Sequence, residues 1–131
     1  AIGAANEAVL ESGRRDEQRR GMGTTLDLVL LARDRAFVAH VGDSRAYRIR
    51  TGDIEQITED HSLLNDYIKA NKLTPEEIEA FPHKNVIVRA LGMKESVKVD
   101  VVLEKPQKDD IYLMCSAGLN DEVTDARMCA P

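Results

Sequence analysis

Two stretches of the sequence decide the fold: AHVGDSRAYRIR at residues 39–50 and DIYLMCSAGLND at residues 110–121. In each, an apolar segment that predicts a strand meets a turn of small or acidic residues. Such a turn can direct carboxylates toward a metal ion, because the strand fixes the backbone and the turn leaves the oxygens free. In the second stretch, the position expected to hold a carboxylate is Ala117. The two stretches therefore predict a metal-binding edge that lacks one ligand.

The composition fits part or all of one domain and excludes several classes of protein. The chain has 131 residues, of which 43% are apolar, and this is enough for a modest core. A net charge of -5 argues against binding to nucleic acid. The one basic cluster is interpreted as a solvated helix end or loop; it contains Arg14, Arg15, Arg19 and Arg20. The sequence does not begin with Met and opens inside an apparent helix, so we expect a piece of a longer polypeptide.

The cysteines and the hydropathy pattern indicate the compartment. Cys115 and Cys129 have no CxxC spacing, which argues against zinc and favours a reducing, cytoplasmic location. No apolar run approaches 18 residues and no signal-peptide pattern is present, so we expect no membrane insertion.

The first half of the chain predicts a short helix followed by strands. A helix over residues 4–10 should stop near Gly13, with a charged loop to Arg20. Residues 26–31 are apolar on both faces, which predicts a strand in the centre of a sheet. Short turns then join four strands in an antiparallel meander; they cover residues 26–31, 36–41, 47–50 and 54–58.

The second half predicts a helical insertion and two further strands. Residues 62–90 should form the insertion, with a capped helix start at Thr74-Pro75. Alternation predicts a half-buried strand over residues 97–103, and residues 111–115 should be a buried strand. A last helix should begin at Glu122.

Several polar residues at strand ends have more than one interpretation. Asp43 fits either a turn that caps its own backbone or a metal ligand. Asp60-His61 reads as a helix cap before Leu63, and Asp121 as a cap for the helix expected from Glu122. His40 is interpreted as a partly buried histidine with satisfied hydrogen bonds rather than as a metal ligand. If the strands are neighbours, these acids meet at one edge and favour Mg²⁺ or Mn²⁺ over zinc.

Five motifs together resemble a known family. They occur in order along nearly the whole chain: GMGTT at residues 21–25, VGDSRAYR at 41–48, TEDHSL at 58–63, RALG at 89–92 and LMCSAGLND at 113–121. In this order they resemble the metal-dependent type-2C serine/threonine protein phosphatases (the PPM family) in their compact bacterial form.

The resemblance implies a fold, a reaction and partners. The fold would be α+β, an αββα sandwich of two antiparallel sheets flanked by helices, with residues 1–131 forming part of one domain and incomplete at both ends. A cluster of Mg²⁺ or Mn²⁺ ions would activate water for hydrolysis of phosphoserine and phosphothreonine in proteins. Residues 62–90 would be the substrate flap, with His83 and Arg89 as its functional residues. A cognate protein kinase would be a further partner.

The metal ligands that the resemblance implies are incomplete in this chain. Asp43 matches the GDSR aspartate, which helps to hold a third, weaker metal, and Ala117 stands where the SDGL aspartate ligand is expected. The phosphate-binding Arg and the bridging Asp-Gly belong before Ala1, and the late Asp-Asn belongs after Pro131. As written, the chain is therefore expected to be inactive or impaired.

Ala117 has two possible explanations. It is either an engineered change that inactivates a phosphatase or a feature of a natural pseudophosphatase that keeps the fold for binding. The corresponding functions are a metal-dependent phosphatase and a non-catalytic module that binds phosphoproteins or regulates. The first requires the early Asp-Gly and the late Asp-Asn in the longer protein.

Overall fold

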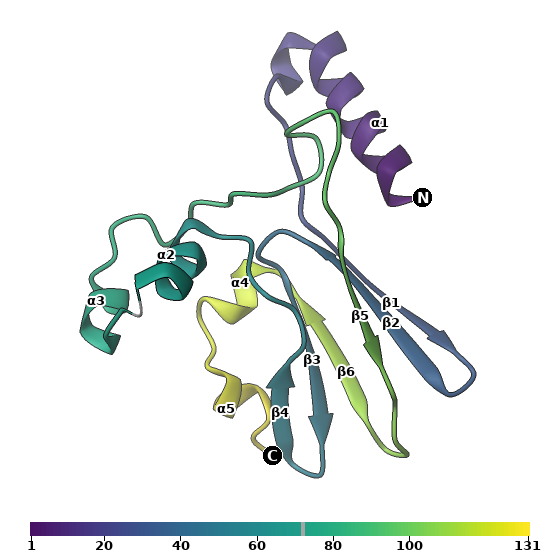
Figure 1. Cartoon of the computed structure of the whole chain (residues 1–131), viewed down its shortest axis with the longest axis vertical. Helices are drawn as coiled ribbons and strands as arrows, with labels where there is room; N and C mark the ends of the chain where they lie inside the picture. Colours follow the sequence, from purple (N-terminus) through teal and green to yellow (C-terminus); the bar gives the residue numbers. More distant parts are fainter. Residues whose placement is uncertain (72) are drawn as a thin grey trace.

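The computed structural model describes residues 1–71 and 73–131 and places the strands in two antiparallel sheets with helices outside them (Figure 1). The first sheet has the order β1-β2-β5, and the second has the order β4-β3-β6. The strands are β1 (Leu26–Ala32), β2 (Arg35–Val41), β3 (Arg45–Arg50), β4 (Asp53–Gln56), β5 (Asp100–Glu104) and β6 (Ile111–Cys115). The α+β sandwich expected from the sequence is confirmed.

The predicted four-strand meander is wrong. β1 and β2 form one hairpin and β3 and β4 form another, but the two hairpins belong to different sheets. The short segment from Gly42 to Ser44 carries the chain from the first sheet to the second instead of folding it back. β3 pairs instead with β6, and β2 pairs with β5, from the far side of the helical segment. The pairing of β3 with β6 thus brings residues 39–50 and 110–121 together.

The inner face of the first sheet is buried and contains a row of ionisable residues. His40 on β2 faces Asp27 on β1 and Asp100 on β5 in the register, so the three side chains share one face. The same face holds Val38, which is completely buried, opposite Val29. An ion pair between Arg48 of β3 and Glu104 of β5 (2.6 Å) connects the two sheets.

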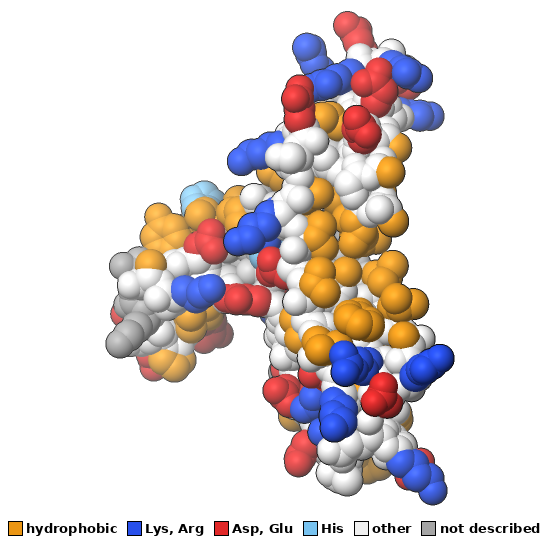
Figure 2. All heavy atoms as spheres, turned by 45° about the vertical axis from the view of Figure 1, so that its right-hand side comes forward, with side chains coloured by type: hydrophobic (Ala, Val, Ile, Leu, Met, Phe, Trp, Pro, Cys, Tyr) orange, Lys and Arg blue, Asp and Glu red, His pale blue; other side chains and the backbone are white. Residues whose placement is uncertain are grey.

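The outer face of the first sheet is apolar and exposed over the part of the chain that the structure describes. Cross-strand partners share this face, and the exposed ones are Leu28, Leu30, Phe37, Val101 and Leu103. Figure 2 shows hydrophobic side chains gathered on this side of the molecule. The apolar residues of β1 on both faces had predicted a central strand, but among the described strands β1 lies at an edge. β6 is likewise only half-buried: Ile111 and Met114 are exposed.

Helix α1 (Ile2–Arg15) is longer than expected and continues through Gly13. A Cβ at Gly13 would lie 3.1 Å from the Arg19 carbonyl, so this glycine permits close packing of the 3₁₀ turn η1 (Glu17–Arg19) instead of stopping the helix. The expected charged loop is therefore largely helical. Buried Asn6 attaches α1 to the RALG loop: its side chain accepts from the Gly92 N–H (2.8 Å) and donates to the Lys94 carbonyl (2.9 Å).

Helices α2 (Leu63–Asn71) and α3 (Pro75–Glu79) project from the sandwich, as Figure 1 shows. The Thr74 hydroxyl accepts from the Glu77 N–H, as the capping pattern predicted. The two ends of this segment are joined by an isolated β-bridge between Ser62 and Ile87. After β6 come α4 (Ala117–Asn120) and α5 (Asp125–Met128). The predicted helix start at Glu122 is therefore wrong, because Glu122 lies between these two short helices. Within the described residues, no helix is both long and apolar enough to cross a membrane.

Candidate functional site

The register of β3 and β6 places Asp43 and Ala117 at the same edge of the second sheet. Arg45, at the start of β3, pairs with Cys115, at the end of β6. Because the strands are antiparallel, the residues just before Arg45 and just after Cys115 leave the sheet together. The GDSR turn and the SAGL turn are therefore neighbours, and the side chain of Asp121 is close enough to influence Asp43 electrostatically.

Gly42 gives the first of these turns a conformation that other residues avoid. Its φ is +112°, and a Cβ there would lie 2.4 Å from Cγ2 of Thr25. The hydroxyls of Thr25 and Ser44 form a hydrogen bond of 2.6 Å across the same turn. The close approach of Thr25 and the positive φ of Gly42 together fix the backbone position from which the Asp43 side chain extends.

Asp43 is half-buried and lies among other acids. Burial raises the pKa of Asp43, and the charges of Asp60 and Asp121 raise it further, against the lowering effects of its own backbone amide and of Arg45. No cationic side chain of residues 1–71 and 73–131 forms an ion pair with Asp43 within 4 Å. A carboxylate in this position favours a bound cation, because the cation would offset the repulsion.

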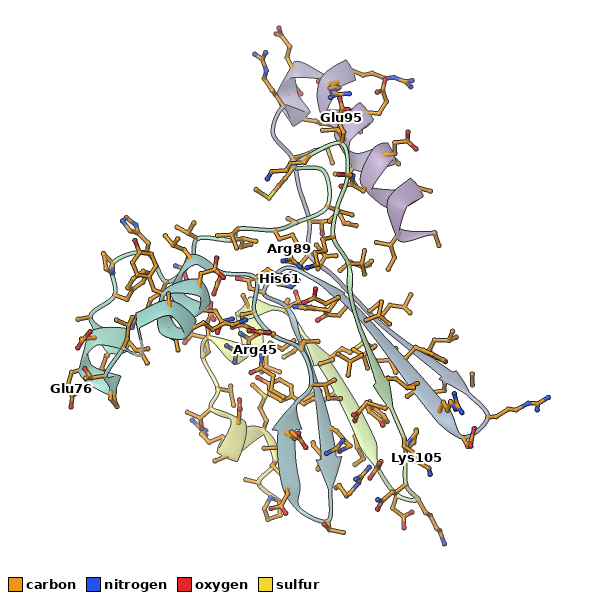
Figure 3. The ribbon with its side chains drawn as sticks, viewed as in Figure 1. Arg45, His61, Glu76, Arg89, Glu95 and Lys105 are labelled. Carbon is orange, nitrogen blue, oxygen red and sulfur yellow. The ribbon has the colours of Figure 1, made fainter. Side chains whose placement is uncertain are left out.

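His61 holds the same turn from inside the protein. Its backbone N–H donates to the Gly42 carbonyl (2.9 Å), and the Gly42 N–H donates to His61 Nδ1 (3.0 Å). Since Nδ1 accepts, the ring proton of the neutral imidazole is on Nε2, 2.7 Å from Oδ2 of Asp100. Arg89 donates to the other oxygen of Asp100 (3.0 Å), and Figure 3 shows Arg89 and His61 side by side.

A second histidine, His40, packs against His61, but the pKa values of the two rings shift in opposite directions. The rings of His40 and His61 are 4.6 Å apart. Burial lowers the pKa of His40, but the hydrogen bond and charge of Asp27 and the Glu59 carbonyl outweigh burial, so the net pKa is raised. Burial also lowers the pKa of His61, where the charges of Arg89 and His40 add to the effect. The prediction that His40 has satisfied hydrogen bonds is confirmed, and the ring is fully buried instead of partly buried.

Two of the expected helix caps are wrong, because these acids have other partners. Both oxygens of Asp60 bind the guanidinium of Arg45, at 2.9 and 2.6 Å, and this bidentate pair fixes the start of β3. The hydroxyl of Ser62 caps α2 by accepting from the Asn65 N–H. Asp121 follows α4 and closes it, because its N–H donates to the Ala117 carbonyl.

The two predicted flap residues occupy different surroundings. His83 is exposed after α3 and packs edge-on against Phe81. Arg89 lies at the base of the projecting segment, where its guanidinium binds Asp100 and the Lys98 carbonyl. Sequence reasoning missed His61, Asp100 and Asp27 as parts of this site. Asp27 and Asp100 each gave one signal, an ionisable residue between apolar neighbours, whereas His61 lies between Asp60 and Ser62 and gave none.

The residues present fit one weakly held cation but not a complete two-ion centre. Asp43 supplies a half-buried carboxylate without a cationic partner, and Ala117 supplies no ligand atom. In the part of the chain that the structure describes, no three His, Cys, Asp or Glu side chains converge as metal ligands. A two-ion site would need carboxylates from elsewhere in a longer protein.

The opposite shifts of the two histidines predict a specific pH dependence of stability. A histidine with a lowered folded pKa destabilises the fold as the pH falls through its unfolded pKa, about 6.5. His61 therefore opposes the gain that His40, with its raised pKa, provides in acid. As the pH falls from 7.5 to 5.5, the free energy of unfolding of the His61→Asn variant should increase more, or decrease less, than that of the unmodified chain. Urea denaturation at both pH values measures this, with exposed His83→Asn as the control; identical pH dependence in the chain and the His61 variant would contradict it.

The two-sheet sandwich, with the GDSR and SAGL turns at one edge, can be compared with known proteins. Residues 3–66 match the family model described as protein phosphatase 2C. The protein phosphatase PhpP of Streptococcus pneumoniae serotype 2 is 39% identical over 123 residues, covering 94% of this chain and 50% of PhpP. Over 94% of its length, the chain is similar to a member of the protein phosphatase 2C family.

Solved structures of the same family superimpose on the chain. A bacterial serine phosphatase superimposes with a TM-score of 0.89 at 35% identity, covering 97% of this chain and 51% of that one. The catalytic domain of the serine/threonine protein phosphatase PstP, in complex with two manganese ions, gives a TM-score of 0.85 at 34% identity, covering 98% and 53%. The family depends on Mg²⁺ or Mn²⁺. The chain spans about half the length of the curated bacterial relatives such as PhpP.

Proposed function

We propose that the protein containing this chain hydrolyses phosphoserine and phosphothreonine in proteins with Mg²⁺ or Mn²⁺. The observation that carries the proposal is the pairing of Arg45 with Cys115, which sets Asp43 beside position 117 at one edge of the sandwich. When bound, the ions would supply an activated water and neutralise phosphoryl charge. Phosphorylated proteins, a cognate kinase and a cytoplasmic location belong to the same proposal.

Each residue at this edge has a proposed role. Asp43 is a weak metal ligand, held by the Gly42 turn and by Ser44. Position 117 is the place of a lost ligand. The Arg45–Asp60 pair keeps the start of β3 fixed, so that Asp43 keeps its direction relative to position 117.

A second candidate function follows from Ala117. A chain that keeps the fold and the phosphatase motifs but lacks this carboxylate fits a pseudophosphatase. Such a protein would act as a module that binds phosphoproteins or has a regulatory role, without hydrolysing phosphate esters. The two candidates differ in one measurable property: whether a protein carrying the remaining half of the domain releases phosphate in the presence of Mn²⁺.

Asp43→Asn in such a longer protein tests the ligand role. We expect turnover to fall by about tenfold and the Mn²⁺ requirement to rise, because an amide oxygen is a weaker ligand than a carboxylate. The melting temperature should change little. The exposed turn residue Asp34, changed to Asn, is the matched control. A large loss of melting temperature with unchanged Mn²⁺ dependence would instead support a capping role for Asp43.

Residues 62–90 are proposed to be a mobile substrate flap that includes His83 and Arg89. α2 and α3 project from the sandwich, and the single Ser62–Ile87 bridge closes the base. Few buried contacts mean a low free energy of local opening. Amide hydrogens of α2 and α3 should exchange faster than those of Leu26–Leu31 and Ile111–Cys115. Equal protection in the three segments would contradict the flap.

A further inference from the structure

His61 joins three parts of the molecule that meet at the candidate site. It is 6% exposed and lies between the Gly42 turn, the inner face of the first sheet and the base of the projecting helices. Its backbone and ring both bind Gly42, its ring reaches Asp100 of β5, and its carbonyl accepts from the Val88 N–H (3.0 Å).

The two contacts to Gly42 fix the two peptide planes on either side of its Cα, and not only a distance. The Gly42 N–H points at Nδ1 of His61, and the Gly42 carbonyl faces the N–H of the same residue. With both groups of Gly42 held, rotation of the turn would break two hydrogen bonds at once. Asp43 is the next residue, so the direction of its side chain depends on this clamp.

We propose that His61 is a positioning residue: through Nδ1 and its backbone amide it fixes the Gly42–Asp43 turn so that the Asp43 carboxylate faces a cation. This inference rests on the proposed role of Asp43 as a metal ligand. Asp100 and Arg89 support it from behind, because Asp100 accepts from Nε2 and so leaves Nδ1 free to accept from Gly42.

Two substitutions of His61, by Asn and by Gln, test its two ring contacts one at a time. Asn at position 61 can place its oxygen near Nδ1 and accept from Gly42, but it is too short to reach Asp100. Gln can reach Asp100 with its NH₂ group but leaves the Gly42 N–H without its acceptor. Both variants remove the imidazole and one hydrogen bond. A merely structural role predicts similar effects of the two, whereas the proposal predicts rescue by Asn.

The experiment is a Mn²⁺ titration of the ¹⁵N-labelled chain, read by paramagnetic broadening of the Asp43 and Ser44 amide signals. His61→Gln should raise the Mn²⁺ concentration at half-broadening by about fivefold, the effect of one lost hydrogen bond. His61→Asn should stay within about twofold of the unmodified chain. Equal shifts in the two variants, or a larger shift for Asn, would overturn the proposal.

Three further measurements keep the outcome unambiguous. Asp43→Asn should weaken broadening and Asp34→Asn should not; if Asp43→Asn has no effect, the ligand role fails and the inference fails with it. If Asp43→Asn weakens the broadening but His61→Gln leaves it unchanged, Asp43 remains a ligand and only the positioning role of His61 fails. The unmodified chain should show a scalar coupling across the hydrogen bond between Gly42 N–H and His61 Nδ1. Should the Gln variant not fold, this coupling decides: its presence supports the clamp, and its absence overturns it.

Discussion

Replacing Ala117 with Asp in a protein that carries the remaining half of the domain is expected to raise Mn²⁺-dependent hydrolysis of a phosphoserine peptide by about a hundredfold to a thousandfold. The register of Arg45 with Cys115 sets position 117 beside Asp43, so a carboxylate there adds a hard oxygen ligand at the shared edge. Ala117 is half-buried at the start of α4, where a short side chain fits. Steady-state phosphate release with and without Mn²⁺ measures the effect.

Two controls accompany this restoration. Ala117→Asn has the same size as Asp but no charge, and it should recover far less activity. Ala117→Asp in the 131-residue chain alone should recover none, because the other ligands that the family implies are not in this sequence. If the restored longer protein is no faster than its parent, position 117 is not a metal position.

The second large effect is expected at Gly42. Gly42→Ala should lower the free energy of unfolding by about 3–5 kcal/mol, because strain at positive φ and overpacking each cost about 1–3 kcal/mol. The added Cβ would lie 2.4 Å from Cγ2 and 2.7 Å from Cβ of Thr25, and only 3.2 Å from its Cα, so Thr25 cannot simply rotate away. Urea denaturation monitored by circular dichroism measures the change.

Gly3 provides the matched control for this substitution. It lies in α1, and a Cβ there would meet nothing within 4 Å. Gly3→Ala should therefore be neutral or stabilise by about 0.5–1 kcal/mol. Similar losses of stability in the two variants would show that the Gly42 turn tolerates a side chain and that its geometry does not require glycine.

The sequence was informative wherever the determining interactions are local. Apolar runs located the strands near residues 26–31 and 111–115, and the Thr74-Pro75 pattern located the start of α3. The motif order indicated a resemblance to a family and hence the sandwich, and the comparisons confirmed the resemblance. These features depend on neighbours a few residues away, which is the range over which propensity and periodicity act.

The assignment of strands to sheets could not be predicted locally. A Gly-Asp turn between two apolar strands looks the same whether it folds the chain back or carries it to a second sheet. The difference depends on the pairing of β3 with β6 and of β2 with β5. His61 was misread for the same reason: its ring partners, Gly42 and Asp100, are 19 and 39 residues away.

The crossover at Gly42 has a consequence for the order of folding. Each hairpin can form early, since its contacts are local, but the shared edge needs Arg45 to meet Cys115 across about 70 residues of chain, a loop whose closure costs entropy. The candidate site is therefore expected to assemble late, after both hairpins are present. Substitutions at the crossover should then mainly accelerate unfolding and leave the rate of folding nearly unchanged.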